Sequence, residues 1–258
     1  CAAGSKMVVL ITGLCSSNCF YCPLSEKKTG KDRIFANEWE LENENDSDKL
    51  IQESIYINAK GAGITGGDPL LVWKRAERYI KILKENFGLN FHIHLYTSGI
   101  KNGKYIDKLV SAGLDEIRFH PDISFWKDMK RAPIVNSIKI ALDNDIDVAI
   151  EIPALPDKKN EIISLIEWAN KHSIKFFNLN EFEFSETNAD MLNKKGFNVK
   201  DSISAAVKGS QGLAIDIIDD ISNKNLDIGI HFCSSSFKDG VQLKNRIKRR
   251  AENISKSF

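Results

Sequence analysis

Three cysteines, Cys15, Cys19 and Cys22, lie within eight positions in the stretch "LCSSNCFYC", and the whole chain has five. Crowding of this kind does not suit a disulfide framework, because such frameworks spread an even number of cysteines over a short secreted chain. Zinc sites usually take four ligands from two paired hooks, and no second hook lies nearby. Three thiolates suit a [4Fe–4S] cluster in which one iron keeps an open position for chemistry. A zinc knuckle or chance clustering remains the alternative from this spacing alone.

A second chemical motif, "TGGDP", follows at residues 65–69. Gly66 and Gly67 would let the backbone approach a ligand closely, while Asp68 offers a carboxylate to a cationic group and Pro69 fixes the turn. Taken alone, such a sequence is common in ordinary turns between helices and strands. Its position about one β/α unit after the cysteine loop indicates a ligand-binding motif.

Elements that would position these motifs can be read from the apolar pattern. Helix-like segments at 69–88 and 161–173 alternate with short apolar runs, which predicts parallel strands joined by right-handed crossovers. All carboxyl ends of the strands would then face one rim, and function should lie there. The predicted strands cover residues 6–13, 59–65, 90–98, 115–120, 147–155, 174–180 and 226–232.

Composition sets broad limits on the class of protein. With 258 residues and 42% apolar residues, the chain suits one α/β domain with a large core. Lys and Arg number 36 against 35 Asp and Glu, so the whole molecule shows no preference for a polyanionic partner. We expect a soluble, cytoplasmic protein without a signal peptide or membrane span. The acidic stretch 40–50 is expected to be a solvated loop.

The two motifs together resemble the radical SAM superfamily. "CSSNCFYC" matches the family's C-x₃-C-x-aromatic-C pattern through the three cysteines and Tyr21, and "TGGDP" resembles its Gly-Gly-Glu motif with Asp68 in place of Glu. More narrowly, the chain looks like an archaeal group related to pyruvate formate-lyase activating enzyme. The stretches that carry this likeness are "GAGITGGDPLL", "HIHLYTSG", "LNEFEFSETNA" and "HFCSSSFKDGVQLKNRIKRRAEN".

The resemblance implies a fold and a reaction. Residues 1–182 would form a partial, open parallel β/α barrel of about six strands, and residues 183–258 a C-terminal extension with a seventh strand and a basic helix, packed on the same domain. Such an enzyme reductively cleaves S-adenosylmethionine (SAM) at a [4Fe–4S] cluster to a 5′-deoxyadenosyl radical, which takes hydrogen from a substrate. The substrate would be a small molecule or a modified polymer, and the reductant a protein such as ferredoxin or flavodoxin.

Cofactor contacts follow from the resemblance. Cys15, Cys19 and Cys22 would bind three irons, and the SAM amino and carboxylate groups would chelate the fourth. Tyr21 would lie beside the adenine, and the turn of Gly66, Gly67, Asp68 and Pro69 would receive the methionine ammonium group.

Other candidate contacts each have a structural alternative. Thr97 and Ser98 follow the third predicted strand, where the family often contacts the ribose, but small polar residues there could cap the next helix. Glu151 would lie near the adenine, although a structural hydrogen bond would also explain a carboxylate among isoleucines. Asn180 ends the sixth predicted strand and is a candidate for cofactor or substrate binding.

The candidates for contact with the reacting groups are Arg118, His120, Glu181 and Cys233. Arg118 and His120 alternate along the fourth predicted strand, so they share one face, where they would need a ligand or a counter-ion. Glu181 and Glu183 alternate with phenylalanines and could form an acidic wall for a cationic substrate, or an ordinary solvated loop.

Cys233 ends the seventh predicted strand. It could donate a hydrogen atom, bind a second metal together with Cys1, hold substrate, or be a small buried apolar group. His92 and His94 lie before the end of their strand, and we expect them to be satisfied core histidines.

Several functions stay open at this point. A glycyl-radical activase and a tRNA-modifying enzyme are alternatives within the family, the latter because residues 241–256 form a basic helix. A non-enzymatic iron–sulfur electron carrier or structural metal protein is the alternative outside it. The glycine motif favours the enzyme, because an electron carrier needs no amine-binding turn.

Overall fold

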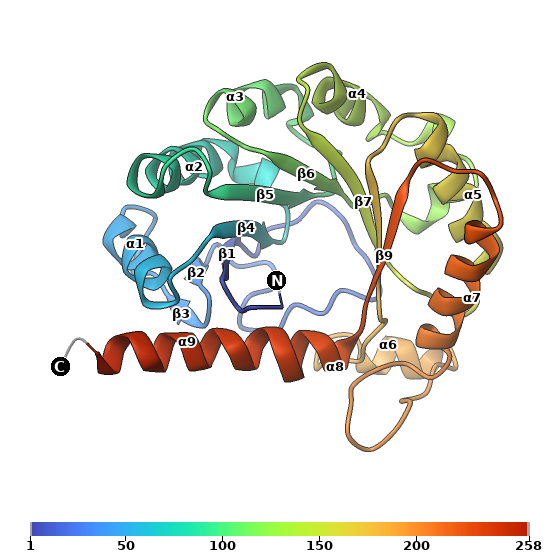
Figure 1. Cartoon of the computed structure of the whole chain (residues 1–258). Helices are drawn as coiled ribbons and strands as arrows, with labels where there is room; N and C mark the ends of the chain where they lie inside the picture. The colour runs from blue at the N-terminus through green and yellow to red at the C-terminus, as the bar shows by residue number, and fades with distance from the viewer. Residues whose placement is uncertain (1, 257–258) are drawn as a thin grey trace.

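One curved sheet organises the molecule (Figure 1). The computed structural model describes residues 2–256, and within them nine strands occur in the order β3-β2-β1-β4-β5-β6-β7-β8-β9. From β1 through β4 to β9 all pairs are parallel, while β2 and β3 form an antiparallel hairpin on the β1 edge. The strands are β1 (Lys6–Thr12), β2 (Phe35–Ala36), β3 (Trp39–Glu40), β4 (Gly61–Gly66), β5 (His92–Thr97), β6 (Glu116–Phe119), β7 (Asp147–Pro153), β8 (Phe176–Asn180) and β9 (Gly229–Cys233).

Helices cover the convex side of this sheet, as Figure 1 shows for α1 to α5 and α7. The α-helices are α1 (Ser47–Tyr56), α2 (Trp73–Phe87), α3 (Ile106–Ser111), α4 (Val135–Asp143), α5 (Lys159–Lys171), α6 (Ala189–Lys194), α7 (Ser210–Ser222), α8 (Ser235–Phe237) and α9 (Lys244–Ser255). Short 3₁₀ turns lie at Pro69–Val72, Gly103–Tyr105, Ile123–Phe125 and Met129–Arg131, and Lys238–Leu243 forms a π-helix.

Alternation along the strands separates an apolar face from a polar one. Ile93 and Leu95 of β5 are fully buried in the hydrophobic core, as are Ile80 and Leu83 of α2. The residues between them on β5, beginning with His92, are polar and lie on the other face. The core therefore lies between sheet and helices, and the concave face is left for polar side chains.

The C-terminal helix α9 closes the open side of the sheet. It runs from α8, below β9, to α1 on the far side of the gap (Figure 1). Arg250 pairs with Glu53 of α1 at 2.9 Å, and Arg249 donates to the carbonyl oxygen of Ile57 at 2.7 Å. The basic residues of this helix thus have their partners on α1 and on the residue that follows it.

The expected elements are largely confirmed. All seven predicted strands occur as β1 and β4 to β9, in a mostly parallel, open sheet of the partial-barrel class. The β2–β3 hairpin was not predicted, because two-residue strands leave no periodic signal. The stretch 40–50 is not wholly a loop, since α1 begins at Ser47 with Asp46 as its N-cap.

The C-terminal extension shares the sheet of the core, because β9 pairs with β8 through Asn180 and Cys233. Cys1 lies outside the described residues. Among the helices of the described residues, none is both long enough and apolar enough to cross a bilayer.

Candidate active site at the carboxyl ends of the strands

The cysteine loop begins directly after β1. Cys15 is exposed, while Cys19 and Cys22 are half-buried. Burial raises the pKa of the Cys19 thiol to about 11, and the nearby thiols of Cys15 and Cys22 act in the same direction. Burial also raises the pKa of the Cys15 thiol. Without a metal these two thiols are therefore protonated at neutral pH, and a bound iron would replace their protons.

The spacing of the three thiols suits a cluster better than a single ion. Thiolate ligands of one zinc ion lie about 2.3 Å from the metal, and hence roughly 4 Å from one another. Among the described residues, ligand atoms gather within 4.8 Å of one another in a different place, at His92, His94 and Glu116, and not at the three cysteines. A [4Fe–4S] cluster takes its thiolates on separate irons, so wider spacing is expected for it.

A clamp from the far end of the chain holds this loop. Thr187 donates its hydroxyl hydrogen toward the carbonyl oxygens of Leu24 at 2.7 Å and Cys22 at 3.2 Å. The Asn188 amide donates to the carbonyl oxygen of Tyr21 at 3.2 Å, and its side chain is buried. We call Thr187 and Asn188 the loop clamp. It fixes the backbone around Cys22 from a segment more than 160 residues away in sequence.

Tyr21 is fixed from the opposite side by His120. The Tyr21 hydroxyl lies 2.9 Å from His120 Nε2, and His120 Nδ1 lies 2.8 Å from the carbonyl oxygen of Glu151. A carbonyl only accepts, so Nδ1 carries the proton and Nε2 accepts from the tyrosine. Burial lowers the His120 pKa, which keeps the ring neutral, and raises that of Tyr21. The aromatic side chain of the cysteine motif is thus anchored to β6 and β7.

The turn after β4 differs from the sequence-based expectation in one respect. The Asp68 side chain is fully buried and accepts hydrogen bonds from Leu70 N at 3.1 Å, from Thr97 Oγ1 at 2.6 Å and from Ser98 Oγ. This arrangement argues against the expected contact of the carboxylate with a ligand ammonium group. Thr97 and Ser98 are also buried, and both hydroxyl groups donate hydrogen bonds to the Asp68 carboxylate. The three side chains brace the turn from beneath.

The two glycines of this turn are required by the cysteine loop. A Cβ on Gly66 would lie 2.1 Å from the carbonyl oxygen of Thr12, and one on Gly67 would lie 2.1 Å from that of Leu14. The backbone amides of Gly67 and Asp68 donate to the same two carbonyls, at 2.8 and 2.7 Å. The close approach that the sequence predicted therefore occurs between turn and loop, so the two motifs form one unit.

Glu151 of β7 is the centre of a polar network on the concave face. Its carboxylate accepts from Arg118 Nη1 at 2.8 Å, from Asn178 Nδ2 at 3.0 Å and from Asn180 Nδ2 at 2.8 Å. Arg118 also pairs with Glu116 at 2.5 Å. Arg118 has thus found the counter-ions that its position on an inward face required. Sequence reasoning missed Asn178, although it alternates with Asn180 along β8.

Cys233 ends β9 beside Asn180, its register partner on β8. The thiol is half-buried, and Gln242 Nε2 lies 3.9 Å from its sulfur. Burial raises the pKa of the Cys233 thiol, so the group is protonated at neutral pH.

The expected acidic wall after β8 is wrong for Glu181. This side chain is buried; its carboxylate accepts from Ser235 N at 2.8 Å and lies 3.5 Å from Lys200 Nζ. Glu183 is half-buried and pairs with Lys238 at 2.5 Å. The Glu181 carboxylate therefore joins the barrel to the C-terminal extension, whereas Glu183 forms its ion pair within that extension.

The structure therefore places most of the predicted side chains in two groups, and Glu181 lies outside both. Tyr21 and His120 meet Arg118, Glu151 and Asn180 on the concave face. A second group forms the braced turn, namely Gly66, Gly67, Asp68, Pro69, Thr97 and Ser98. Sequence reasoning missed the loop clamp because its partners lie in a distant segment, although Thr187 and Asn188 stand in the stretch "LNEFEFSETNA" that carries the family likeness.

Comparison with known proteins agrees with this geometry. Residues 9–169 match the radical SAM superfamily, so the chain belongs to that superfamily, whose cofactors are SAM and a [4Fe–4S] cluster. Over its full length the chain is 41% identical to a Methanocaldococcus jannaschii protein that is provisionally named a glycyl-radical enzyme activating enzyme, and it covers 68% of that protein. It is 29% identical over 150 residues to a Methanococcus maripaludis protein provisionally named a GTP 3′,8-cyclase; the match covers 58% of this chain and 47% of the relative.

Solved structures share the fold at low sequence identity. Streptococcus suis SuiB bound to S-adenosylmethionine superimposes with a TM-score of 0.63 at 10% identity, over 90% of this chain and 51% of SuiB. Methylornithine synthase superimposes with a TM-score of 0.59 at 11% identity, over 93% of this chain and 69% of the synthase. The chain thus spans about half to two thirds of the proteins it matches, and it is a radical SAM enzyme with an open α/β barrel.

Proposed function

We propose that this chain generates a radical from SAM at a cluster held by Cys15, Cys19 and Cys22, and directs it at a glycine residue in a polypeptide. The observation that carries the cofactor assignment is the unit formed by the cysteine loop and the Gly66–Gly67 turn. When bound, the cluster and SAM supply a 5′-deoxyadenosyl radical that abstracts hydrogen. The remaining assignments concern what the side chains of this chain do.

Protein groups around this unit have distinct roles in the proposal. Tyr21, held by neutral His120, offers a fixed aromatic surface for the adenine. Asp68, Thr97 and Ser98 act as positioning residues, because they hold the turn and not the ligand. Glu151 and Asn180 present oxygen and nitrogen atoms on the concave face for the ribose or the substrate. Cys233 lies on the adjoining strand as a protonated thiol.

A polypeptide substrate is supported by the M. jannaschii relative, whose likeness extends over the whole of this chain, whereas that of the cyclase relative covers 58%. A tRNA substrate has less support, because three arginines of α9 already have partners within the protein. Arg246 pairs with Glu38, Arg249 donates to the carbonyl oxygen of Ile57, and Arg250 pairs with Glu53. Charges already paired within the protein contribute little to binding of phosphates.

The test of the reaction is anaerobic reconstitution followed by reduction in the presence of SAM. The parent chain should bind four irons and accumulate 5′-deoxyadenosine. Cys15→Ala should lose the cluster, while Cys233→Ser should keep the cluster and the uncoupled cleavage of SAM. A full cluster in the variant with all three cysteines replaced by alanine would overturn the ligand assignment.

The substrate class has a separate test. The reduced enzyme is incubated with extracts of M. jannaschii cells grown in deuterated medium, and 5′-deoxyadenosine is analysed by mass spectrometry. Deuterium transfer from the macromolecular fraction should disappear after protease treatment and persist after RNase treatment. Transfer that is lost with RNase, or that comes only from the small-molecule fraction, would reject a polypeptide substrate and leave the cofactor chemistry intact.

A further inference from the structure

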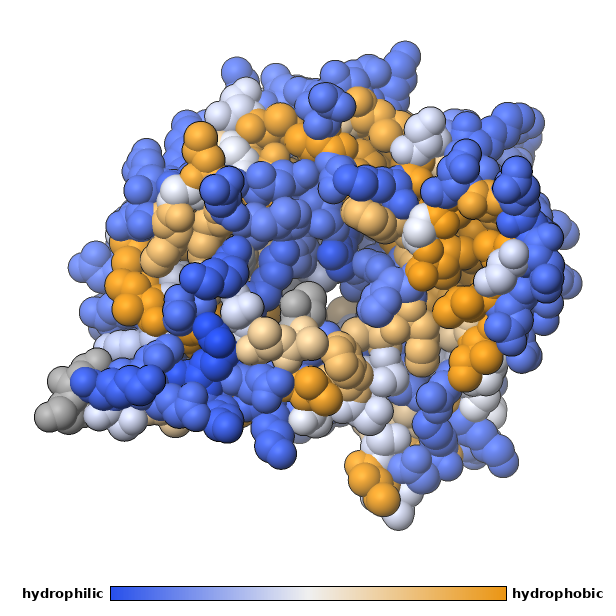
Figure 2. Space-filling model, in the orientation of Figure 1, coloured by the Kyte–Doolittle hydropathy of each residue, from blue (hydrophilic) through white to orange (hydrophobic). Residues whose placement is uncertain are grey.

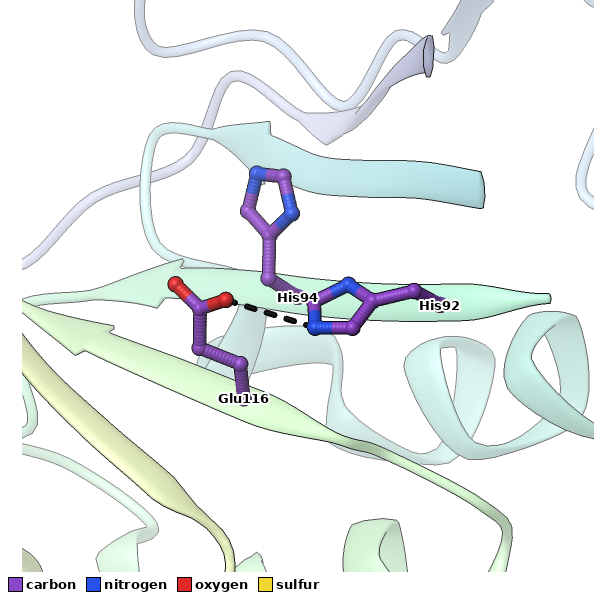
Figure 3. Close-up of side chains that lie close together, drawn as sticks. All are labelled: His92, His94 and Glu116. Carbon is purple, nitrogen blue, oxygen red and sulfur yellow. Dashed lines mark ion pairs between the residues drawn. The ribbon is translucent and has the colours of Figure 1, made fainter. Parts of the chain in front are cut away.

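The amino ends of β5 and β6 carry a second group of metal-ligand side chains, at the opposite end of the barrel from the cysteine loop. His92 is the first residue of β5, His94 follows two positions later on the same face, and Glu116 is the first residue of β6. One ligand atom from each of the three lies within 4.8 Å of the other two. Figure 3 shows the His92 ring and the Glu116 carboxylate pointing toward one another, with the His94 ring rising from the same strand.

Distances and burial in this group fit a metal ion. His92 Nε2 and Glu116 Oε2 are 3.4 Å apart. Two ligands about 2.1 Å from a tetrahedral zinc ion are roughly 3.4 Å from each other. His94 is buried, and its Nδ1 atom has no hydrogen-bond partner among the described residues. A buried nitrogen without a partner is costly and needs an explanation, which a bound ion would supply.

The outer atom of each of the three side chains has its own partner. His94 Nε2 contacts the Tyr96 hydroxyl at 3.1 Å, and His92 Nδ1 contacts Lys6 Nζ at 2.8 Å. Glu116 Oε1 accepts from Arg118 at 2.5 Å. For His94 and Glu116 the outer contact fixes the side chain and leaves an inner lone pair for a metal, as in known protein metal sites. The Lys6 ammonium group can only donate, so His92 Nδ1 accepts from it, and the ring proton lies on Nε2 in the metal-free protein.

Space for the group is also built into the fold. A Cβ on Gly63, the register partner of His94 on β4, would lie 2.6 Å from His94 Nε2, so only glycine leaves room for this ring. The His92 side chain is 41% exposed. In Figure 2 the face in view is hollowed at its centre, inside the curve of the sheet, and hydrophilic residues lie around much of the hollow. The exposed part of the His92 side chain is therefore within reach of water and ions.

We propose that His92, His94 and Glu116 bind one divalent cation of the zinc class, through His92 Nε2, His94 Nδ1 and Glu116 Oε2, with water in the fourth position. Two imidazoles and one carboxylate with an open position suit Zn²⁺, and also Co²⁺ and Fe²⁺. On binding, the His92 ring proton moves from Nε2 to Nδ1, and the Lys6 ammonium group, which only donates, gives up its contact with Nδ1. The site is independent of the proposed reaction, because its ligands are distinct from the cluster cysteines.

Cobalt is the probe, because its spectrum distinguishes nitrogen and oxygen ligands from thiolates. After the three cysteines are occupied by the reconstituted cluster, the parent chain is titrated with Co²⁺ under anaerobic conditions. One equivalent should bind with visible d–d bands and without thiolate-to-cobalt charge transfer. Zn²⁺ should displace it, and should raise the unfolding midpoint of the protein, because it binds the folded state.

Variants then test the ligands. His94→Gln and Glu116→Gln should each weaken Co²⁺ binding by more than about 100-fold, since even the loss of an outer contact costs roughly 10- to 100-fold. His172→Gln is the matched control, because His172 is an exposed residue of the α5 C-terminus, stacked on Trp168. Far-ultraviolet circular dichroism checks folding, and the variant lacking all three cluster cysteines provides an independent background. Binding that follows the cysteines, or that the two ligand variants leave unchanged, would overturn the proposal, as would the absence of stoichiometric binding.

Discussion

Replacement of Asp68 tests whether this carboxylate braces the turn or contacts the ligand. Three donors depend on it: the Leu70 amide, the Thr97 hydroxyl and the Ser98 hydroxyl. Asp68→Ala leaves all three buried without their acceptor, at a cost of roughly 1 kcal/mol or more each. The variant should therefore lose about 3 kcal/mol of stability.

Asp68→Asn separates the two roles. Asparagine keeps the shape, its oxygen can accept from Leu70 N and Thr97, and the Ser98 hydroxyl can turn to accept from its amide. The loss of stability should be only about 1 kcal/mol. If Asp68 acts through the turn, this variant retains SAM binding that Asp68→Ala loses. If the carboxylate contacts the ammonium group of SAM, both variants lose it.

Urea unfolding of the chain without cluster measures the stability. With an m-value of about 3 kcal/mol/M, a loss of 3 kcal/mol lowers the midpoint by about 1 M in Asp68→Ala. Asp46→Ala is the matched control, because Asp46 caps α1 from a half-buried position and its loss should cost about 1 kcal/mol. An Asp68→Ala midpoint no lower than that of Asp46→Ala would refute the bracing role.

Three further predictions concern contacts between distant segments. Asn188→Ala should expose the cysteine loop and speed thiol modification of Cys22 in the cluster-free chain by about 10-fold, from a loss of about 1.4 kcal/mol. Asn86→Ala, at an exposed position of α2, should leave the rate unchanged, and equal rates in the two variants would show that Asn188 does not hold the loop. Burial lowers the His120 pKa, so below pH 6.5 the unfolded chain takes up a proton that the folded chain does not. As the pH is lowered, the free energy of unfolding therefore decreases by up to about 1.4 kcal/mol per pH unit from this group. Urea midpoints between pH 7.5 and 5.5 should therefore fall less in His120→Gln, and an unchanged slope would contradict this assignment. Glu53→Ala leaves Arg250 without its buried partner and should lower the free energy of unfolding in urea by about 3 kcal/mol. The control Glu38→Ala removes an exposed partner of Arg246 and should lower it by less than about 1 kcal/mol. Similar losses in the two variants would show that α9 is held by other contacts.

Local pattern determined the strands, and together with the turn motif at residues 65–69 it indicated the chemistry of the cluster. Short apolar runs between helical segments predicted β1 and β4 to β9, because strands of a parallel sheet are buried on both faces and their sequences are therefore continuously apolar. Three crowded thiols after β1 predicted a cluster loop for a related reason: the spacing of ligands on one short segment needs no information from the rest of the chain. The place of that loop at the carboxyl end of a parallel strand followed from chain connectivity.

Only the tertiary structure decided which side chains are available to a ligand. Asp68 and Glu181 looked like contacts because carboxylates at strand ends are often exposed, yet buried donors from Ser98 and Ser235 occupy them. The loop clamp of Thr187 and Asn188 joins segments far apart in sequence, and no local period encodes such a contact. The same holds for His94, Gly63 and Glu116, which three different strands bring together. Hydrogen-bond partners are set by which strands become neighbours, and the sheet order is a property of the whole fold.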